Sequence, residues 1–163
     1  MAVSIFTGIA QGGQPLISAA HGIGDKDRLR AVLRYSIISQ LVIALMVYLA
    51  IAFFTTPIAA IFNSEHIASL QRMAEDGMKI YFTGLFFSGF NIIISAFFAA
   101  SEKIIPAQTI TILRGFALIV PMAFIMSKAA GLTGVWLAYP VTEFIVAAIS
   151  IIFYIRNLSL IHI

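Results

Sequence analysis

Five long apolar stretches, separated by short polar or charged segments, dominate the pattern of this sequence. They cover about residues 1–22, 35–62, 80–101, 105–127 and 131–155. An α-helix rises about 1.5 Å per residue, so each stretch is long enough to cross the roughly 30 Å hydrocarbon core of a bilayer. The pattern predicts an all-α, polytopic membrane protein in which residues 1–163 form a single membrane domain, a bundle of about five transmembrane helices.

Polar residues recur at steps of three and four in the first stretch, which places them on one face of a helix. They are Ser4, Thr7, Gln11, Gln14, Ser18 and His21. In hydrocarbon such groups are satisfied by other helices, by water in a cavity or by cargo. Gln11, Gln14 and Ser18 are therefore candidate cavity-lining residues.

Glycines and prolines mark positions where the predicted helices are expected to bend. Gly12, Gly13 and Pro15 weaken the backbone hydrogen bonding in the middle of the first stretch, and we expect a bend or an unwound turn there. Pro121 and Pro140 are expected to bend the fourth and fifth helices, because proline lacks a backbone donor.

The second stretch is longer than a bilayer requires. Tyr35 to Ser64 is uncharged over about 30 residues, or about 45 Å of helix. We expect it to tilt, protrude or break near Thr55, Thr56 and Pro57. The mixed charges that follow predict a short surface helix over Leu70 to Lys79.

One acid, Glu143, lies deep inside the last apolar stretch. An acid at the centre of a membrane helix costs roughly 2.5–3.5 kcal/mol, so it is expected to be paired or functional. Its helix face, within about 40°, also carries Trp136, Tyr139, Ser150 and Tyr154. This face is predicted to contact protein or water. Two interpretations stay open: an acid neutralised by one neighbour, or an acid that titrates or touches cargo.

Arg114 matches Glu143 in depth. If the fourth and fifth stretches form an antiparallel hairpin that turns near Lys128 and Ala129, both residues are equally far from the turn. We therefore expect a charge pair, which relieves part of each burial cost. Asn91, in a seam of small and polar residues on the third stretch, is a further candidate for the cavity wall.

Composition excludes most other classes of protein. Of 163 residues, 61% are hydrophobic and 10% are charged, whereas soluble domains average about 25% charged residues. The absence of cysteine excludes disulfides and Cys-metal sites. The net charge of +3 is spread between apolar stretches, so no nucleic-acid partner is expected. No nucleophile with a base, carboxylate pair or metal-ligand spacing is present, and we expect neither an enzyme nor a metal site.

Loop charges predict an orientation. Six basic residues lie on the side that holds the first loop, Lys103 and Arg156, whereas the opposite side has three, at Arg72, Lys79 and Lys128. The more basic side is expected to be cytoplasmic. The amino end would then lie outside without a charged anchor, so we expect a fragment of a longer protein.

Three stretches carry a resemblance to a known family: GIAQGGQPLISAAHGIGDKDRLR, FNIIISAFFAASEKIIPAQTITILRGFALIVPMAF and GLTGVWLAYPVTEF. Together they resemble the carboxyl-terminal lobe of the multidrug and toxic compound extrusion (MATE) transporters. The most specific parts are Gln11 to Ile17 and the GxxGxWxAxPxxE pattern from Gly131 to Glu143. Because that family has twelve helices in two lobes, the resemblance implies helices eight to twelve, with the amino-terminal lobe as a missing partner.

The resemblance implies part of a secondary active multidrug efflux transporter in the cell membrane. Such a protein exports small organic, often cationic compounds in exchange for Na⁺ or H⁺ by alternating access. The residues implied to line or brace its cavity are Gln11, Gln14, Asn91, Arg114, Tyr139 and Glu143. No cofactor is expected, and the main coupling-ion site is expected outside this chain. The alternatives are a related flippase for lipid or polysaccharide precursors, and a membrane scaffold or accessory subunit that transports nothing.

Overall fold

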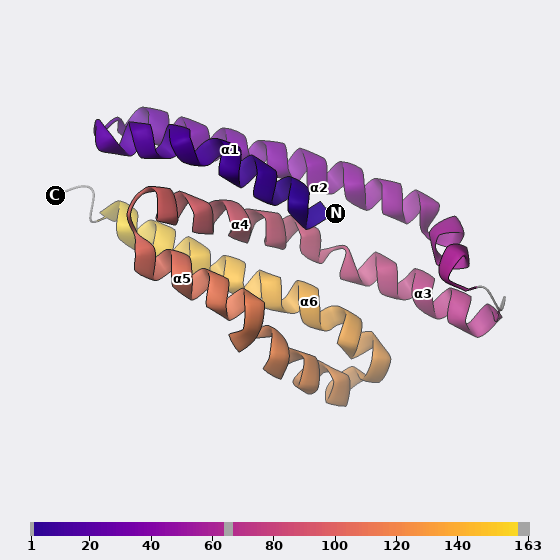
Figure 1. The fold of residues 1–163 in the computed structure, drawn as a ribbon. Coiled ribbons are helices and arrows are strands. Elements are labelled where there is room, and N and C mark those ends of the chain that lie inside the picture. Colours follow the sequence, from indigo (N-terminus) through magenta and orange to yellow (C-terminus); the bar gives the residue numbers. More distant parts are fainter. Residues whose placement is uncertain (1, 64–66, 160–163) are drawn as a thin grey trace.

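The computed structural model describes residues 2–63 and 67–159, which form helices and no strand (Figure 1). The elements in chain order are α1 (Ala2–Gly22), α2 (Lys26–Phe62), α3 (Ala68–Tyr81), α4 (Gly84–Ala100), α5 (Ile104–Ile112), the π-helical turn η1 (Leu113–Ala117) and α6 (Ile119–Ser159). The predicted all-α class is confirmed.

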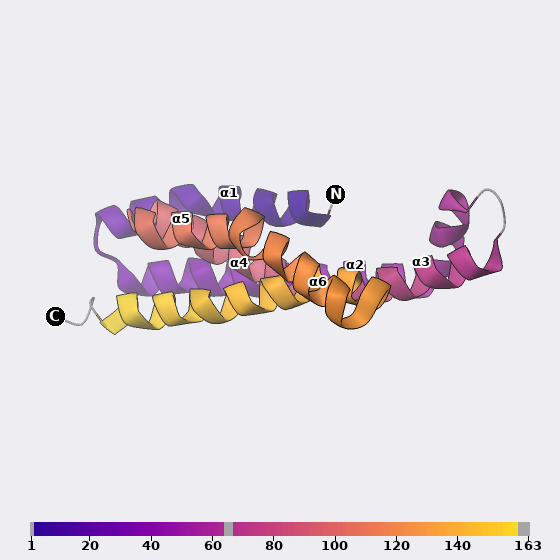
Figure 2. The same cartoon turned by 90° about the horizontal axis from the view of Figure 1, so that it is seen from below.

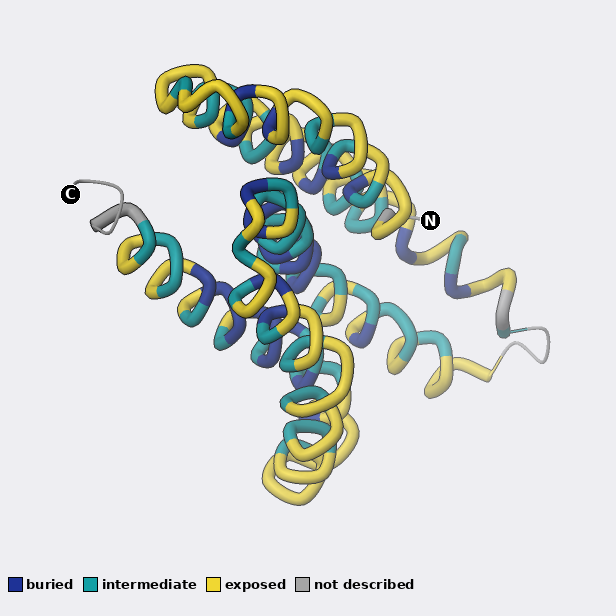
Figure 3. The backbone as a smooth tube through the Cα atoms, turned by 60° about the vertical axis from the view of Figure 1, so that its left-hand side comes forward, coloured by how far each residue is buried: buried dark blue, intermediate teal, exposed yellow. Residues whose placement is uncertain are grey.

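The α4 helix is the centre of the bundle and packs against α1, α2, α5 and α6. Its sequence is almost wholly apolar or small, so it can be buried on several sides. Leu85, Ile93, Ile94 and Phe98 are at most 3% exposed and form much of the core. Burial is concentrated along this central helix, while the outward faces of its neighbours are exposed (Figure 3).

The chain between α4 and the carboxyl end forms an antiparallel hairpin (Figures 1 and 2). Its turn lies inside α6, where Gly131 has a left-handed φ of 56° that favours glycine. A Cβ at Gly134 would collide with the carbonyl of Met126, so the second glycine lets the two arms meet. The predicted hairpin is thus present, and it turns just after Lys128 and Ala129.

The long α2 helix breaks where its sequence predicts. Phe54 has non-helical angles, φ −105° and ψ 18°, three residues before Pro57. The hydroxyl of Thr55 donates to the carbonyls of Ile51 at 2.5 Å and of Ala52 at 3.1 Å, which satisfies acceptors near the break.

The α3 helix includes the residues of the predicted surface helix, Leu70 to Lys79, and it also packs against the rest of the bundle. Only a short turn at Phe82 and Thr83 separates it from α4, and the two helices follow one another in the same general direction (Figures 1 and 2). Gly77 is buried under the ring of Trp136. A Cβ at this position would lie 2.5 Å from the ring, so the absence of a side chain allows the close contact. The α3 helix therefore extends α4 and packs on α6.

Among the described residues, three helical stretches are long and apolar enough to cross a membrane: Lys26–Ile61, Ala68–Ala100 and Ile104–Asn157. The last stretch contains the hairpin, so it holds two antiparallel arms. The α1 helix has sufficient length, but its glutamines and other polar residues lower its mean hydropathy. The total of five crossings stays a prediction.

Candidate functional site

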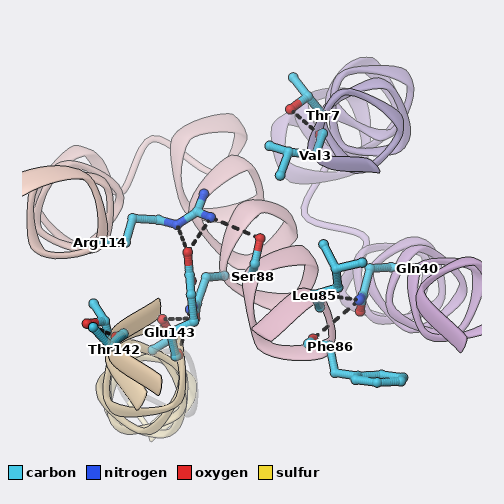
Figure 4. A network of polar contacts seen from close by, with 12 residues as sticks. Val3, Thr7, Gln40, Leu85, Phe86, Ser88, Arg114, Thr142 and Glu143 are labelled. Atoms are coloured by element: carbon cyan, nitrogen blue, oxygen red, sulfur yellow. Dashed lines mark hydrogen bonds and ion pairs between the residues drawn. The ribbon is translucent and has the colours of Figure 1, made fainter. Parts of the chain in front are cut away.

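The structure brings Arg114 and Glu143 together across the hairpin, as their depths predict (Figure 4). Nη2 of Arg114 donates to Oε1 of Glu143 at 2.7 Å, and Nε donates to the same oxygen at 3.2 Å. The Arg114 side chain is 18% exposed, whereas that of Glu143 is only 3% exposed. The arginine therefore reaches the surface, and the acid lies behind it.

Polar side chains of α4 and α6 complete the network around this pair. Asn91 donates through Nδ2 to Oε2 of Glu143 at 2.7 Å and to its backbone carbonyl at 2.9 Å. Ser150 donates to Oδ1 of Asn91 at 3.2 Å, and Nη2 of Arg114 donates to the hydroxyl of Ser88 at 3.2 Å. Asn91, Ser88 and Ser150 are fully buried. Both carboxylate oxygens are engaged, which is what a buried charge requires.

The π-helical turn η1 carries Arg114. The N–H of Leu118 donates to the carbonyl of Leu113, five residues earlier, at 2.9 Å. Pro121 follows within a turn and supplies no N–H to the carbonyl of Ala117. The irregularity predicted at Pro121 therefore lies about one turn earlier, in η1. It changes the direction in which the Arg114 side chain leaves the helix. Such π-helical turns are frequent at functional sites.

A groove of 310 Å³ lies beside this network, between α1, α4, α5 and η1. We call it the polar groove, and its polar lining residues are Thr7, Gln11, Gln14, Ser95, Thr111 and Arg114. Hydroxyls and amides can both donate and accept hydrogen bonds, so this wall can satisfy varied polar groups. Glu143 neutralises the one cation in the wall from behind.

The predicted cavity residues lie in different places. Gln11 and Gln14 line the polar groove. Asn91 and Glu143 are buried behind its wall, so they brace Arg114 and do not line the groove. Ser18 lies one turn beyond Gln14, and its hydroxyl donates to the carbonyl of Ala100 at 3.2 Å, which ties α1 to the end of α4.

Tyr139 lies outside the polar groove. Its ring stacks on that of Tyr81, with centroids 4.5 Å apart and an interplanar angle of 16°. A Cβ at Gly84 would lie 2.6 Å from the Tyr139 ring, so the missing side chain leaves the space that the ring fills. Tyr139 therefore helps to hold the end of α3 against α6.

The backbone stays helical at two of the places where bends are predicted. The α1 helix is uninterrupted through Gly12, Gly13 and Pro15, so the chain does not unwind there, and the bend stays a prediction. Gly13 faces α2, where a Cβ would make an ordinary van der Waals contact with the hydroxyl of Ser36 at 3.4 Å. The α6 helix keeps helical backbone angles at Pro140.

Sequence reasoning missed the contact between Gln40 and Gly89. Gln40 is fully buried, and its Nε2 donates to the carbonyls of Leu85 at 3.4 Å and Phe86 at 3.3 Å (Figure 4). A Cβ at Gly89 would collide with the Gln40 side chain. The signal in the sequence is a single amide side chain, Gln40, in the apolar part of α2. Nothing in the sequence indicates that this side chain contacts Gly89 of α4.

No group of three or more His, Cys, Asp or Glu side chains in the described part of the chain is arranged to hold a metal ion. The site is therefore built from amides, hydroxyls and one ion pair. Its groups donate and accept hydrogen bonds and form one ion pair.

Comparisons with known proteins agree on one family. The family model MatE matches residues 1–125. Multidrug export protein MepA of Staphylococcus saprophyticus is 28% identical over 156 residues, which cover 94% of this chain and 34% of that relative. MepA of Staphylococcus aureus strain MSSA476 is also 28% identical, over 155 residues and with the same coverage. The chain thus spans about a third of the length of these curated relatives.

Two solved structures share the fold. One is an inward-facing and the other an outward-facing conformation of a multidrug resistance MATE family transporter of the MOP superfamily. The TM-scores are 0.90 and 0.88, each at 21% sequence identity. The matches cover 99% of this chain and 37% and 36% of the solved chains.

Proposed function

The chain belongs to the MatE family, and we propose that it forms part of a secondary active multidrug efflux transporter. In this proposal the whole protein exports organic, often cationic compounds in exchange for Na⁺ or H⁺ by alternating access, in the cell membrane. Members of this family are transporters and not enzymes. The near-equal TM-scores against the two conformations support a unit that keeps its internal structure while access alternates.

The observation that carries the proposal is the polar groove with a neutralised arginine in its wall. Gln11 and Gln14 offer amide groups from a helix that is otherwise mostly apolar and small. An isolated Arg114 would repel a cationic cargo, but the Glu143 carboxylate 2.7 Å away cancels its charge. A groove of this kind can accept organic cations as well as neutral polar compounds.

We assign Glu143 a bracing role and propose that the main coupling-ion site lies outside this chain. Both of its carboxylate oxygens are already occupied, by Arg114 and by Asn91. A carboxylate that binds a coupling ion needs an oxygen within reach of water, whereas Glu143 is 2% exposed. The geometry thus supports the first of the two interpretations, an acid neutralised by its neighbours.

Dye export by cells tests this function. The full coding region, with any sequence upstream of Met1, is expressed in cells that lack their own exporters, and ethidium accumulation is measured. Q11A/Q14A should weaken apparent affinity roughly thirtyfold, because two groove hydrogen bonds of about 1 kcal/mol each are lost. The matched control N157A removes an amide that bonds within its own helix, at 2.9 Å to Phe153, and should export normally.

Vesicles separate the remaining possibilities. Export driven by an imposed sodium gradient but not by a proton gradient, or the reverse, identifies the coupling ion. No dye export by a protein that reaches the membrane in normal amounts would sink the multidrug proposal. Movement of labelled lipid or polysaccharide precursors would then favour the flippase, and no transport at all would favour the scaffold.

A further inference from the structure

A second groove lies between α2 and α6, where both helices pack on α4. We call it the apolar furrow; it has a volume of 450 Å³, and its apolar lining includes Leu33, Ile37, Phe90, Ile94, Ile151 and Tyr154. A neighbouring cavity of 190 Å³ continues it toward the start of α2 and shares Arg30 and Tyr154 with it. Ligand sites commonly have volumes of about 300–1,000 Å³, so the furrow has the size of a ligand site.

Cations gather at one end of this apolar surface. Arg30 and Arg34 both line the furrow, and their spacing of four residues places them on one face of α2. Lys26 and His21 line the adjoining cavity. No carboxylate is present among the lining residues of either cavity. Within residues 2–63 and 67–159, neither Arg30 nor Arg34 forms an ion pair.

The furrow therefore has a cationic end and an apolar end, as a lipid has a polar headgroup and apolar acyl chains. Arg30 and Arg34 lie in the first three turns of α2, next to the loop that is predicted to be cytoplasmic, so they are at headgroup level. The lining farther along α2 offers hydrocarbon contacts and the ring of Tyr154. A polypeptide segment without helical structure would find almost no hydrogen-bond partners there, which argues against an extended peptide.

We propose that the apolar furrow binds an anionic phospholipid, with its phosphate between Arg30 and Arg34 and an acyl chain along Ile37, Phe90 and Ile94. Arginine recognises phosphate with paired donors, and the absence of lining carboxylates leaves a positive potential for a headgroup of net negative charge. A zwitterionic lipid fills the same apolar surface but gains less at the cationic end. This site does not depend on the proposed export function.

Native mass spectrometry of the protein in mild detergent tests the proposal. The protein is titrated with phosphatidylglycerol or with phosphatidylcholine that carries the same acyl chains. The expected result is that phosphatidylglycerol is retained about tenfold more strongly, and that R30Q/R34Q removes this preference. R30K/R34K should keep most of it. The control R72Q/K79Q removes two cations on α3, outside the furrow, and should bind like the unaltered protein.

The wild-type preference is measured without any substitution, so the test holds even if R30Q/R34Q fails to fold. Equal retention of the two lipids overturns the proposal, as does full retention of phosphatidylglycerol by folded R30Q/R34Q. Displacement of the lipid by millimolar inorganic phosphate also overturns it, because that result identifies a site for free anions. No binding of either lipid by the full-length protein points to a furrow covered by another helix, and likewise sinks the lipid site.

Discussion

The polar groove and the apolar furrow lie on opposite sides of one helix. Ile92, Ser95, Ala96 and Ala99 of α4 line the polar groove. Phe90, Ile94 and Phe97 line the apolar furrow and its adjoining cavity. At about 100° per residue, the two sets point about 180° apart around α4.

The difference teaches how one uncharged helix can present two unlike surfaces. On one side α4 has small or hydroxyl residues apart from Ile92, and its partners contribute amides and an arginine neutralised by a buried acid. On the other side it has aromatic and branched residues, and cations are present only at the end of the furrow. The first side offers hydrogen-bonding groups, and the second offers an apolar surface with cations at one end.

Removal of Arg114 should have the largest effect, because it destroys the polar side. R114Q leaves Glu143 with one partner at 3% exposure, and we expect a loss of about 3–5 kcal/mol in the free energy of unfolding. E143Q should cost less, because Arg114 is 18% exposed and can be hydrated. Unfolding in mild detergent, followed by circular dichroism, measures both losses.

A matched arginine on the other side provides the control. R30Q removes an exposed cation from the apolar furrow and should change stability by no more than about 0.5 kcal/mol. The exchange R114E/E143R should recover part of the loss, since the pair is restored in reverse. Equal stability of R114Q and R30Q would show that the ion pair does not brace the wall.

A polar residue on the apolar side should have the second largest effect. Ile94 is 2% exposed, and I94N should cost about 3 kcal/mol through lost burial and an unsatisfied amide. A99N places the same amide at an exposed position of the polar groove and should cost under about 0.5 kcal/mol. Similar losses for the two variants, measured by the same unfolding assay, would remove the distinction between the sides.

The contact between Gln40 and Gly89 should have a moderate effect, because it holds α2 on α4 without belonging to either groove. G89A pushes a methyl group into the Gln40 side chain, and we expect a loss of about 1–2 kcal/mol. In Q40A/G89A the obstruction is gone, so the combined loss should be smaller than the sum of the single losses. Additive losses in this double-mutant cycle would contradict direct contact.

The sequence predicts the helices and the ion pair because both follow from one-dimensional spacing. Apolar length locates the helices, and equal distance from a turn places Arg114 opposite Glu143. The polar face of α1 likewise predicts Gln11 and Gln14 as lining residues. Spacing along one helix does not tell which neighbour meets it, so Thr111 in the groove wall could not be identified.

Corrections arise where tertiary packing outweighs local preference. Pro15 lowers helix propensity, yet α1 stays continuous because it is packed against α2 and α4. Tyr139 shares a face with Glu143, and its ring packs on Tyr81 and fills the space left at Gly84. The helices that pack on α1 and the residues that contact Tyr139 cannot be recognised from the sequence of a single helix.

Labelling tests the comparison with the smallest disturbance of the fold. The chain has no cysteine, so Q11C and I38C each introduce one unique thiol at an exposed position, with little expected effect on stability. In membranes, Q11C in the polar groove should react quickly with a charged, water-soluble thiol reagent. I38C, which borders the apolar furrow and is 45% exposed, should react mainly with an apolar reagent that partitions into lipid. Equally fast reaction of both thiols with the charged reagent would show that water reaches both the polar groove and the apolar furrow. The two sides of α4 would then not face different solvents.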